Sequence, residues 1–203
     1  AIVADFSVEW DNGALPITRF IRNHLAFKYP AKWPLVEWNN WYDDLGYPTE
    51  QSVLDGAKAS AAMGCELVTL DAGWYGGNGS WEKQCGNWKP NKKRFPNGLK
   101  PLIKKVRKLG MKFGLWIEIE SASPDSLVVK EHPDWLLRDG GQLASGRSVL
   151  DFGKPEVVAW AKSVIDRLMQ NYHLDYRKDD FNTDLIVDSE ASKYASGDPL
   201  YFH

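Results

Sequence analysis

Four apolar segments of the chain end in polar side chains that could act together in one reaction. Side chains on a β-strand alternate between two faces, so counting along the segments 34–41, 66–74, 112–120 and 174–182 assigns each polar residue to a face. One face of the four segments carries Trp41, Asp71, Glu118, Glu120, Lys178, Asp180 and Asn182. A single carboxylate at a strand end is usually only solvated. Carboxylates or their partners at the ends of all four segments instead predict a site.

Asp180 is the carboxylate best suited to act as a nucleophile. Lys178 lies two positions before it on the same face, and a nearby cation favours the ionised carboxylate. Lys178 could also donate hydrogen bonds to a substrate. Asp179 is the alternative nucleophile, but alternation turns it away from Lys178. Arg177 and Asp179 would then face a helix layer, where apolar residues are expected, and we expect them to form pairs with neighbouring residues.

Aromatic residues make up 13% of the chain, and several of its ten tryptophans fall in segments that we expect to be loops. The apolar C–H face of a sugar stacks on such rings, so Trp41, Trp74 and Trp88 are candidates for the walls of a sugar site. Packing in the core is the alternative interpretation, because large aromatic side chains dominate protein cores.

The elements that would position these residues follow a regular order. A strand over 1–12 and a helix starting at Pro16 come first, followed by a proline-punctuated connector at 28–34. Each of the four predicted strands is then followed or preceded by an amphipathic helix. These helices are expected after an N-cap at Thr49 and ending at Gly64, over 97–110 and over 154–172. Alternating strands and helices of this kind are typical of parallel βαβ units.

Four βα units leave two architectures open: an open four-stranded α/β domain, or the N-terminal half of a (β/α)8 TIM barrel, which needs about 250 residues to close. We favour the half-barrel, because catalytic groups in barrels come from the carboxyl ends of the strands. No glycine-rich phosphate-binding motif follows the first strand, so a nucleotide-binding sheet is unsupported.

Several motifs in order resemble glycoside hydrolase family 36, the melibiase-like α-galactosidases, which share a clan with family 27. The similar stretches are VTLDAGWYG (68–76), Trp88 with NKKRFPNGLKPL (91–102), MKFGLWIEIESASPDS (111–126), EHPDWLL (131–137), VLDFGKPEV (149–157) and DYRKDDFN (175–182). The last resembles a K-x-D-x-N motif and implies that Asp180 is the catalytic nucleophile, between Lys178 and Asn182. The resemblance also implies that Asp71 accepts hydrogen bonds from sugar hydroxyls, and Arg147 is a further candidate for sugar contact.

The resemblance implies domains, an activity and partners. Residues 1–28 would be the end of a preceding β-sandwich domain with a linker helix, and 29–203 the first four βα units of the catalytic barrel. The activity would be retaining hydrolysis of terminal α-linked galactose in oligosaccharides or glycoconjugates, without cofactor or metal. The general acid of the family follows the sixth strand, so we expect residues 1–203 alone to be inactive and to need the remainder of the same barrel.

One departure from the family keeps other functions open. The family usually has a second aspartate where this chain has Ala72. Its loss could weaken sugar binding by about 1.5–3 kcal/mol, or could indicate another glycone, as in an α-N-acetylgalactosaminidase or galactosaminidase. A transglycosylase and a non-catalytic carbohydrate-binding half-barrel are the remaining alternatives.

Composition gives no support to nucleic acid or membrane as a binding partner. The net charge of −2 gives no field to attract nucleic acid, and no apolar run approaches the roughly 20 residues that span a bilayer. Two cysteines do not make a disulfide framework, and their scarcity favours a cytoplasmic setting. We expect Cys65 to be a small core residue and Cys85 to be a free thiol in a polar loop.

Overall fold

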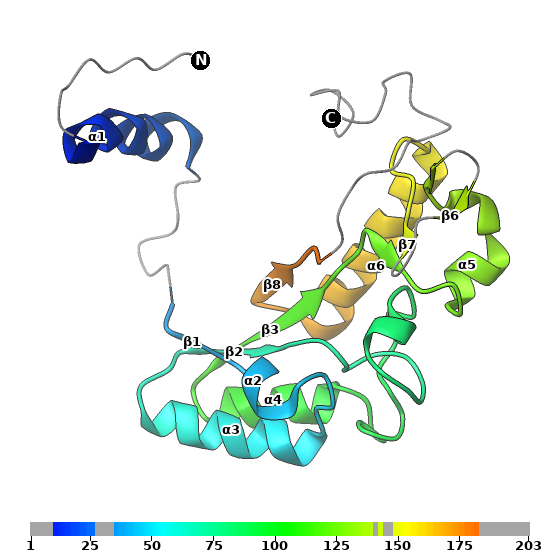
Figure 1. Cartoon of the computed structure of the whole chain (residues 1–203). Helices are drawn as coiled ribbons and strands as arrows, with labels where there is room; N and C mark the ends of the chain where they lie inside the picture. The colour runs from blue at the N-terminus through cyan, green and yellow to red at the C-terminus, as the bar shows by residue number, and fades with distance from the viewer. Residues whose placement is uncertain (1–9, 27–34, 140–141, 144–147, 183–203) are drawn as a thin grey trace. The chain divides into compact units, whose positions relative to one another are not determined.

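The computed structural model describes residues 10–26, 35–139, 142–143 and 148–182, and the chain divides into two compact units, Ala1–Leu35 and Val36–His203 (Figure 1). In the first unit, helix α1 (Trp10–Phe20) continues into a π-helical turn, Ile21–Leu25. The strand expected over 1–12 is wrong for Trp10–Asn12, which are helical, and residues 1–9 lie outside the described part. The expected helix start at Pro16 is wrong as well. A proline inside a helix removes only one backbone hydrogen bond, and here the helix runs through it.

The second unit is built on a four-stranded parallel sheet in the order β1-β2-β3-β8. Its strands are β1 (Glu37–Asn39), β2 (Leu67–Leu70), β3 (Lys112–Ile117) and β8 (Tyr176–Asp179). Trp38 pairs with Val68, Val68 with Phe113, and Trp116 with Lys178. All four predicted strands are therefore present. Each is shorter than expected, because the chain leaves the sheet before its polar end residues.

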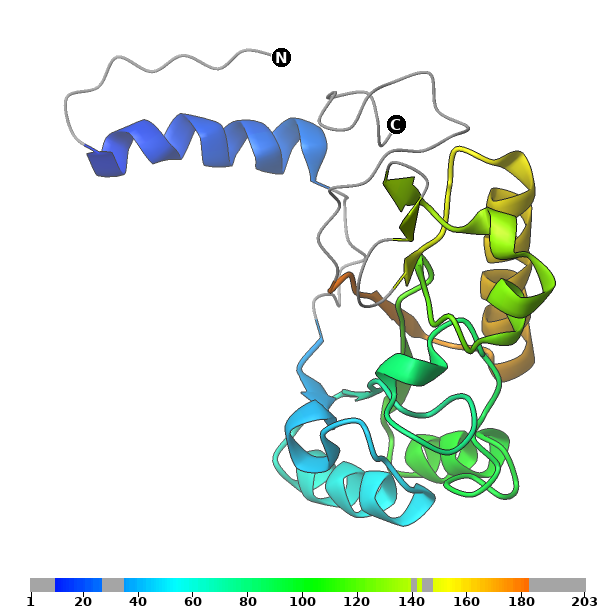
Figure 2. The ribbon, with the colours of Figure 1, turned by 45° about the vertical axis from the view of Figure 1, so that its right-hand side comes forward.

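Three helices connect these strands and cover one face of the sheet, as the two views in Figures 1 and 2 show. Helix α3 (Glu50–Ala62) begins with a capping box between Thr49 and Ser52, and Gly64 follows it with a positive φ of 91°. Helix α4 (Lys100–Lys108) and helix α6 (Pro155–Tyr172) both begin with a proline in the first turn, where its missing N–H removes no helical hydrogen bond. The three predicted helices are confirmed, with ends within a few residues of the prediction.

The core lies between the sheet and the helices. Phe113, Leu115 and Ile117 of β3 are at most 1% exposed and belong to the same apolar cluster as Leu102 and Val106 of α4. Val53 and Ala57 of α3 and Val164 and Leu168 of α6 extend this cluster. Trp116, on the other parity of β3, is 1% exposed and belongs to the same cluster, so both faces of this strand are buried.

Shorter elements surround the sheet. They are α2 (Trp41–Asp44), α5 (Leu127–Glu131), two 3₁₀ turns (Glu82–Gln84 and Pro133–Trp135), and the antiparallel pairs β4–β7 (Ser121–Ala122, Ser148–Val149) and β5–β6 (Arg138–Asp139, Gln142–Leu143). No helix among the described residues is long and apolar enough to cross a membrane.

Neither Cys65 nor Cys85 forms a disulfide, as expected, but Cys85 is the more deeply buried of the two. Cys85 is fully buried in the core, with its Sγ 3.5 Å from the Tyr75 hydroxyl, whereas Cys65 is only partly buried at the edge of the same cluster. The polar sequence around Cys85 does not indicate this burial, because the thiol is covered by contacts such as those with the Tyr75 hydroxyl and the Trp81 carbonyl.

Candidate active site

Asp71 and Lys178 form the centre of the polar cluster. Lys178 Nζ lies 2.8 Å from Asp71 Oδ2, although the two residues are 107 positions apart. Asn39 Nδ2 donates to the same oxygen at 2.6 Å, and the Ala72 amide donates to Oδ1 at 2.8 Å. The Asp71 side chain is only 4% exposed, whereas that of Lys178 is 35% exposed. A carboxylate this buried needs hydrogen-bond donors or a cation as partners. The Lys178 side chain, in contrast, remains accessible to solvent.

Asp180 lies one residue beyond β8 and is held by three donors. Trp116 Nε1 and Asn182 Nδ2 reach its Oδ2 at 3.0 and 2.9 Å, and the Phe181 amide donates to its Oδ1 at 3.0 Å. The Asp180 amide donates to the Ile117 carbonyl at 2.9 Å, which fixes the turn after the strand. The carboxylate is therefore oriented by donors while the residue stays partly exposed.

The electrostatics of the cluster favour an ionised Asp180 beside a charged lysine. Burial alone would raise the pKa of Asp180, but the hydrogen bonds from Asn182 and Trp116 outweigh it. The Phe181 amide and the charge of Lys178 act in the same direction, so the pKa of Asp180 lies below its ordinary value. Burial alone would lower the pKa of Lys178, but its hydrogen bond to Asp71 and the Asp71 charge raise it above the usual value.

Glu118 and Asn182 form a second, deeper group. Glu118 is fully buried; its Oε1 accepts from the Ser121 hydroxyl at 2.7 Å and from the Asn182 amide at 3.0 Å. Asn182 Nδ2 lies 3.3 Å from Glu118 Oε2 and also donates to Asp180. Asn182 therefore links Glu118 to Asp180, and Glu118 serves to position Asn182.

The opposite face of β8 carries the rival nucleophile. Both Arg177 Nε and Nη2 reach Asp179 Oδ2, at 3.0 and 2.7 Å, so these two residues pair with each other. The charges of Asp179, Glu118 and Arg177 all act on Glu120. Burial raises the pKa of Glu120, and its buried Oε2 has no hydrogen-bond partner among the described residues. Alternation fails for Glu120 because β3 ends at Ile117.

The predicted tryptophans do not share one wall. Trp41 opens helix α2 instead of ending a strand, and its amide donates to Asn39 Oδ1 at 2.8 Å. A cavity of about 440 Å³ is lined by Glu37, Asn39, Trp41, Tyr42, Tyr176 and Lys178, so Trp41 and Lys178 border one space. Trp74 and Trp88, by contrast, are 0% and 2% exposed. Their rings pack in the core, so neither presents an open face beside Asp180.

Sequence reasoning left Trp116 out of the predicted site. Its ring lies 6.2 Å from that of Trp88, centroid to centroid, and Trp74 Nε1 donates to the Trp116 carbonyl at 2.9 Å. Trp74 and Trp88 therefore support the ring whose Nε1 binds Asp180. The signal was available, because Trp116 has the same parity on its strand as Glu118.

Arg94 links the loop that follows α2 to the loop that follows β2. Its Nη1 donates to the carbonyls of Gly46 and Gly73 at 3.0 and 2.6 Å. Gly73 has a φ of +92°, and a Cβ there would lie 2.0 Å from the Gly46 carbonyl oxygen, so only glycine fits this contact. Arg147, the last predicted contact residue, lies outside the described residues. Within the described part of the chain, no group of three or more His, Cys, Asp or Glu could hold a metal ion.

Comparison with known proteins identifies the family of this chain. Residues 15–198 match the melibiase family. The chain belongs to the melibiase family. Similar curated members include α-galactosidase AgaA of Geobacillus stearothermophilus, 36% identical over 71% of this chain and 20% of that protein, and the probable α-galactosidase C of Aspergillus flavus, 36% identical over 81% and 24%. The chain thus spans about a fifth to a quarter of the length of these melibiase relatives.

Solved structures of the family share the fold. A family 36 α-galactosidase variant, AgaA of Geobacillus stearothermophilus in complex with raffinose, superposes with a TM-score of 0.77 at 31% identity, covering 85% of this chain and 24% of that one. Another AgaA variant, in complex with stachyose, gives a TM-score of 0.72 at 30% identity over 81% and 24%. The parallel βαβ sheet of this melibiase family member is therefore part of a TIM barrel. The domain boundary expected at residue 28 stays a prediction.

Proposed function

We propose that the protein hydrolyses terminal α-linked galactose from oligosaccharides or glycoconjugates with retention of configuration, using Asp180 as the nucleophile. The observation that carries this proposal is the environment of Asp180. Its carboxylate lies beyond the carboxyl end of a barrel strand, is kept ionised by its donors, and has Lys178 and Asp71 nearby. Membership of the melibiase family supports the same reaction.

In this reaction the Asp180 carboxylate attacks the anomeric carbon from the face opposite the leaving oxygen. The glycosidic C–O bond breaks, the leaving oxygen takes a proton from an acid, and a galactosyl ester on Asp180 forms. Water then attacks the same carbon and gives one proton to the conjugate base of that acid, which releases galactose and the free carboxylate. The low pKa of Asp180 fits both steps, because the group must be ionised to attack and must be a good leaving group afterwards.

The remaining residues bind and orient the sugar in this proposal. Lys178 and Asp71 offer a charged donor and acceptor to ring hydroxyls, and Trp41 borders the same cavity as Lys178. Asn182 and Trp116 hold the nucleophile from its sides.

The proposal is tested by removing the nucleophile and replacing it from solution. The variant Asp180→Ala of the full-length protein should lose turnover of p-nitrophenyl α-galactoside, and added azide should restore release of nitrophenol with β-galactosyl azide as the product. In the unchanged protein, NMR should show α-galactose as the first sugar released. Release of β-galactose first would overturn the retaining mechanism.

One residue favours a second candidate glycone. Ala72 replaces the second aspartate of the family motif and is 1% exposed, so this position offers no charged acceptor to a hydroxyl. An α-N-acetylgalactosaminidase is the alternative that this departure allows. A higher kcat/KM for p-nitrophenyl α-N-acetylgalactosaminide than for the α-galactoside would establish it.

A further inference from the structure

Trp81, in the loop after β2, contacts two aromatic rings of the candidate site. It directly follows the glycine-rich stretch 76–80. Its ring lies 5.7 Å from that of Trp116 and 5.5 Å from that of Trp41, centroid to centroid, with interplanar angles of 87° and 88°. Edge-to-face pairs of rings at this spacing attract each other. Trp81 therefore touches both the ring whose Nε1 donates to Asp180 and the ring that borders the cavity of about 440 Å³.

The backbone around Trp81 fixes the place of its indole. Trp81 directly precedes the 3₁₀ turn Glu82–Gln84, and its carbonyl accepts from the Gln84 amide at 3.0 Å. The ring itself lies against Gly46, where an added Cβ would come within 2.3 Å of Trp81 Cδ1, so a side chain at that position would displace the ring. Gly46 also has a φ of +84°, which favours glycine. The Trp81 ring is thus held in place by the protein itself.

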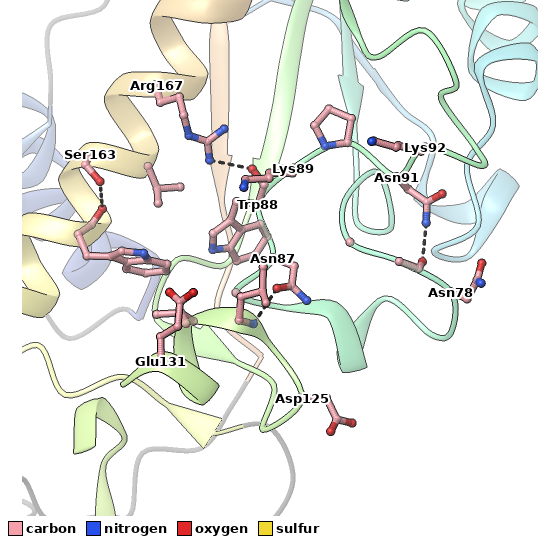
Figure 3. A pocket seen from close by; sticks show the side chains of 18 of the residues that line it. Asn78, Asn87, Trp88, Lys89, Asn91, Lys92, Asp125, Glu131, Ser163 and Arg167 are labelled. Carbon is pink, nitrogen blue, oxygen red and sulfur yellow. Dashed lines mark hydrogen bonds between the residues drawn. The ribbon is translucent and has the colours of Figure 1, made fainter. Parts of the chain in front are cut away.

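Three rings of the described residues contact Trp116, and they differ in burial. Tyr75 and Trp88 lie 5.9 and 6.2 Å from it, and both are at most 2% exposed. Figure 3 shows Arg167 above Trp88, and Arg167 Nη2 donates to the Trp88 carbonyl at 2.8 Å, which ties that residue to α6. Trp81, in contrast, is only partly buried and packs against the same cluster. It can therefore be changed with less damage to the core than Tyr75 or Trp88.

We propose that Trp81 is a positioning residue, which holds the Trp116 ring and thereby the hydrogen bond from Trp116 Nε1 to Asp180, and which supports Trp41 at the cavity. This inference rests on the proposed function for the role of Asp180. A hydrogen bond to a carboxylate is stronger than one to a neutral carboxyl group, so the Trp116 bond favours the ionised nucleophile. Without the Trp81 ring, Trp116 loses one of its packing partners and its bond to Asp180 loosens.

The charged groups near Asp180 are left unchanged by a substitution at Trp81. Lys178 lies two residues before Asp180, and its charge lowers the pKa of that carboxyl group. The charged residues at the ends of the neighbouring strands are Lys178 and Asp179 of β8, Asp71 after β2, and Glu118 and Glu120 after β3. Because all of them are kept, we expect a change in the ionisation of Asp180 to come from the indole hydrogen bond.

The test is the pH dependence of hydrolysis by the full-length protein. In Trp81→Ala, the acid limb of kcat/KM for p-nitrophenyl α-galactoside should move up by about 0.5–1 pH unit, which is part of the shift for complete loss of a hydrogen bond to a charged group. The limb moves up because Asp180 acts only when ionised and its pKa rises. KM should also rise, through the loss of support for Trp41. Trp81→Phe keeps an aromatic ring and should return the limb most of the way.

Trp160→Ala is the matched control. Trp160 is also a partly buried indole that packs against the core, but its ring contacts that of Trp135, at 6.3 Å. This variant should lower Tm, as Trp81→Ala does, while its acid limb stays where it is. An unmoved limb in Trp81→Ala, or an equal shift in Trp160→Ala, would overturn the positioning role.

A second measurement is independent of turnover. A water-soluble carbodiimide reacts with a protonated carboxyl group, so the pH dependence of labelling at Asp180, resolved to the residue by mass spectrometry, reports its pKa. In Trp81→Ala the midpoint should rise by about 0.5–1 pH unit. If the midpoint rises but the unchanged protein hydrolyses no α-galactoside, the proposed function fails while the positioning role stands. If the protein hydrolyses the substrate but the midpoint does not move, only the positioning role fails.

Discussion

Two adjacent aspartates at the end of β8, Asp179 paired with Arg177 and Asp180 bound by Trp116, provide a sharp test of the site. The change from Asp180 to Asn keeps the size of the side chain and an oxygen that can accept from Trp116 Nε1 or Asn182 Nδ2. It removes the negative charge that attacks the anomeric carbon. Loss of a group that acts in the chemical step costs on the order of 10⁴–10⁶ in kcat, so we expect a loss of that size.

The matched change is Asp179→Asn, one residue away. Asp179 pairs with Arg177 at 2.7 Å, and the two side chains are 49% and 33% exposed. A surface ion pair of this kind contributes about 0.2–1 kcal/mol to stability. If the whole of this free energy stabilised the transition state and was lost in the variant, kcat would fall by about fivefold at most. The two variants should therefore differ by a factor of about 10³ or more.

The assay is release of nitrophenol from p-nitrophenyl α-galactoside by the full-length protein, with Tm as the control for folding. Galactose binding should persist in Asp180→Asn, because Lys178 and Asp71 are untouched. Similar losses of kcat in the two variants would refute the reasoning, since they would mean that the faces of β8 are not separated as the structure has them. A large loss in Asp179→Asn alone would make Asp179 the nucleophile.

Three further predictions follow from single contacts. Asn182→Ala removes a donor from the Asp180 carboxylate, so the pKa of Asp180 rises. Since Asp180 works only when ionised and loses activity as pH falls through its pKa, the acid limb of kcat/KM should move to higher pH; an unmoved limb would contradict this. Ala72→Asp buries a carboxylate at a site that is 1% exposed, so we expect a loss of about 1–3 kcal/mol in unfolding free energy. Tighter galactose binding by Ala72→Asp, measured in an Asp180→Asn background, would show instead that the carboxylate reaches the sugar. Arg94→Gln removes the hydrogen bonds to the Gly46 and Gly73 carbonyls. It should raise KM for the α-galactoside more than it lowers kcat. The control Lys58→Gln, on the surface of α3, should change neither KM nor kcat.

Local patterns in the sequence determined much of the second unit. The apolar period of the helices, the Thr49 cap and the positive-φ glycine at 64 were enough to predict α3, because capping and helix termination are decided within a few residues. Alternation was enough to separate Lys178 and Asp180 from Asp179, because the two faces of a strand follow from its geometry alone. The motif around Asp180 was sufficient to indicate the family, which the comparisons confirm.

Tertiary structure decided what lies beyond the strand ends, where alternation stops. Glu120 was expected on the same face as Glu118, but β3 ends at Ile117, so strand alternation does not extend to either residue. Trp74 and Trp88 were expected to line a sugar site, but a loop folded over the sheet buries them behind Trp116. The ion pair of Asp71 with Lys178 joins residues 107 positions apart. No local pattern can specify such contacts, because they depend on which strands are neighbours and where each chain segment leaves the sheet.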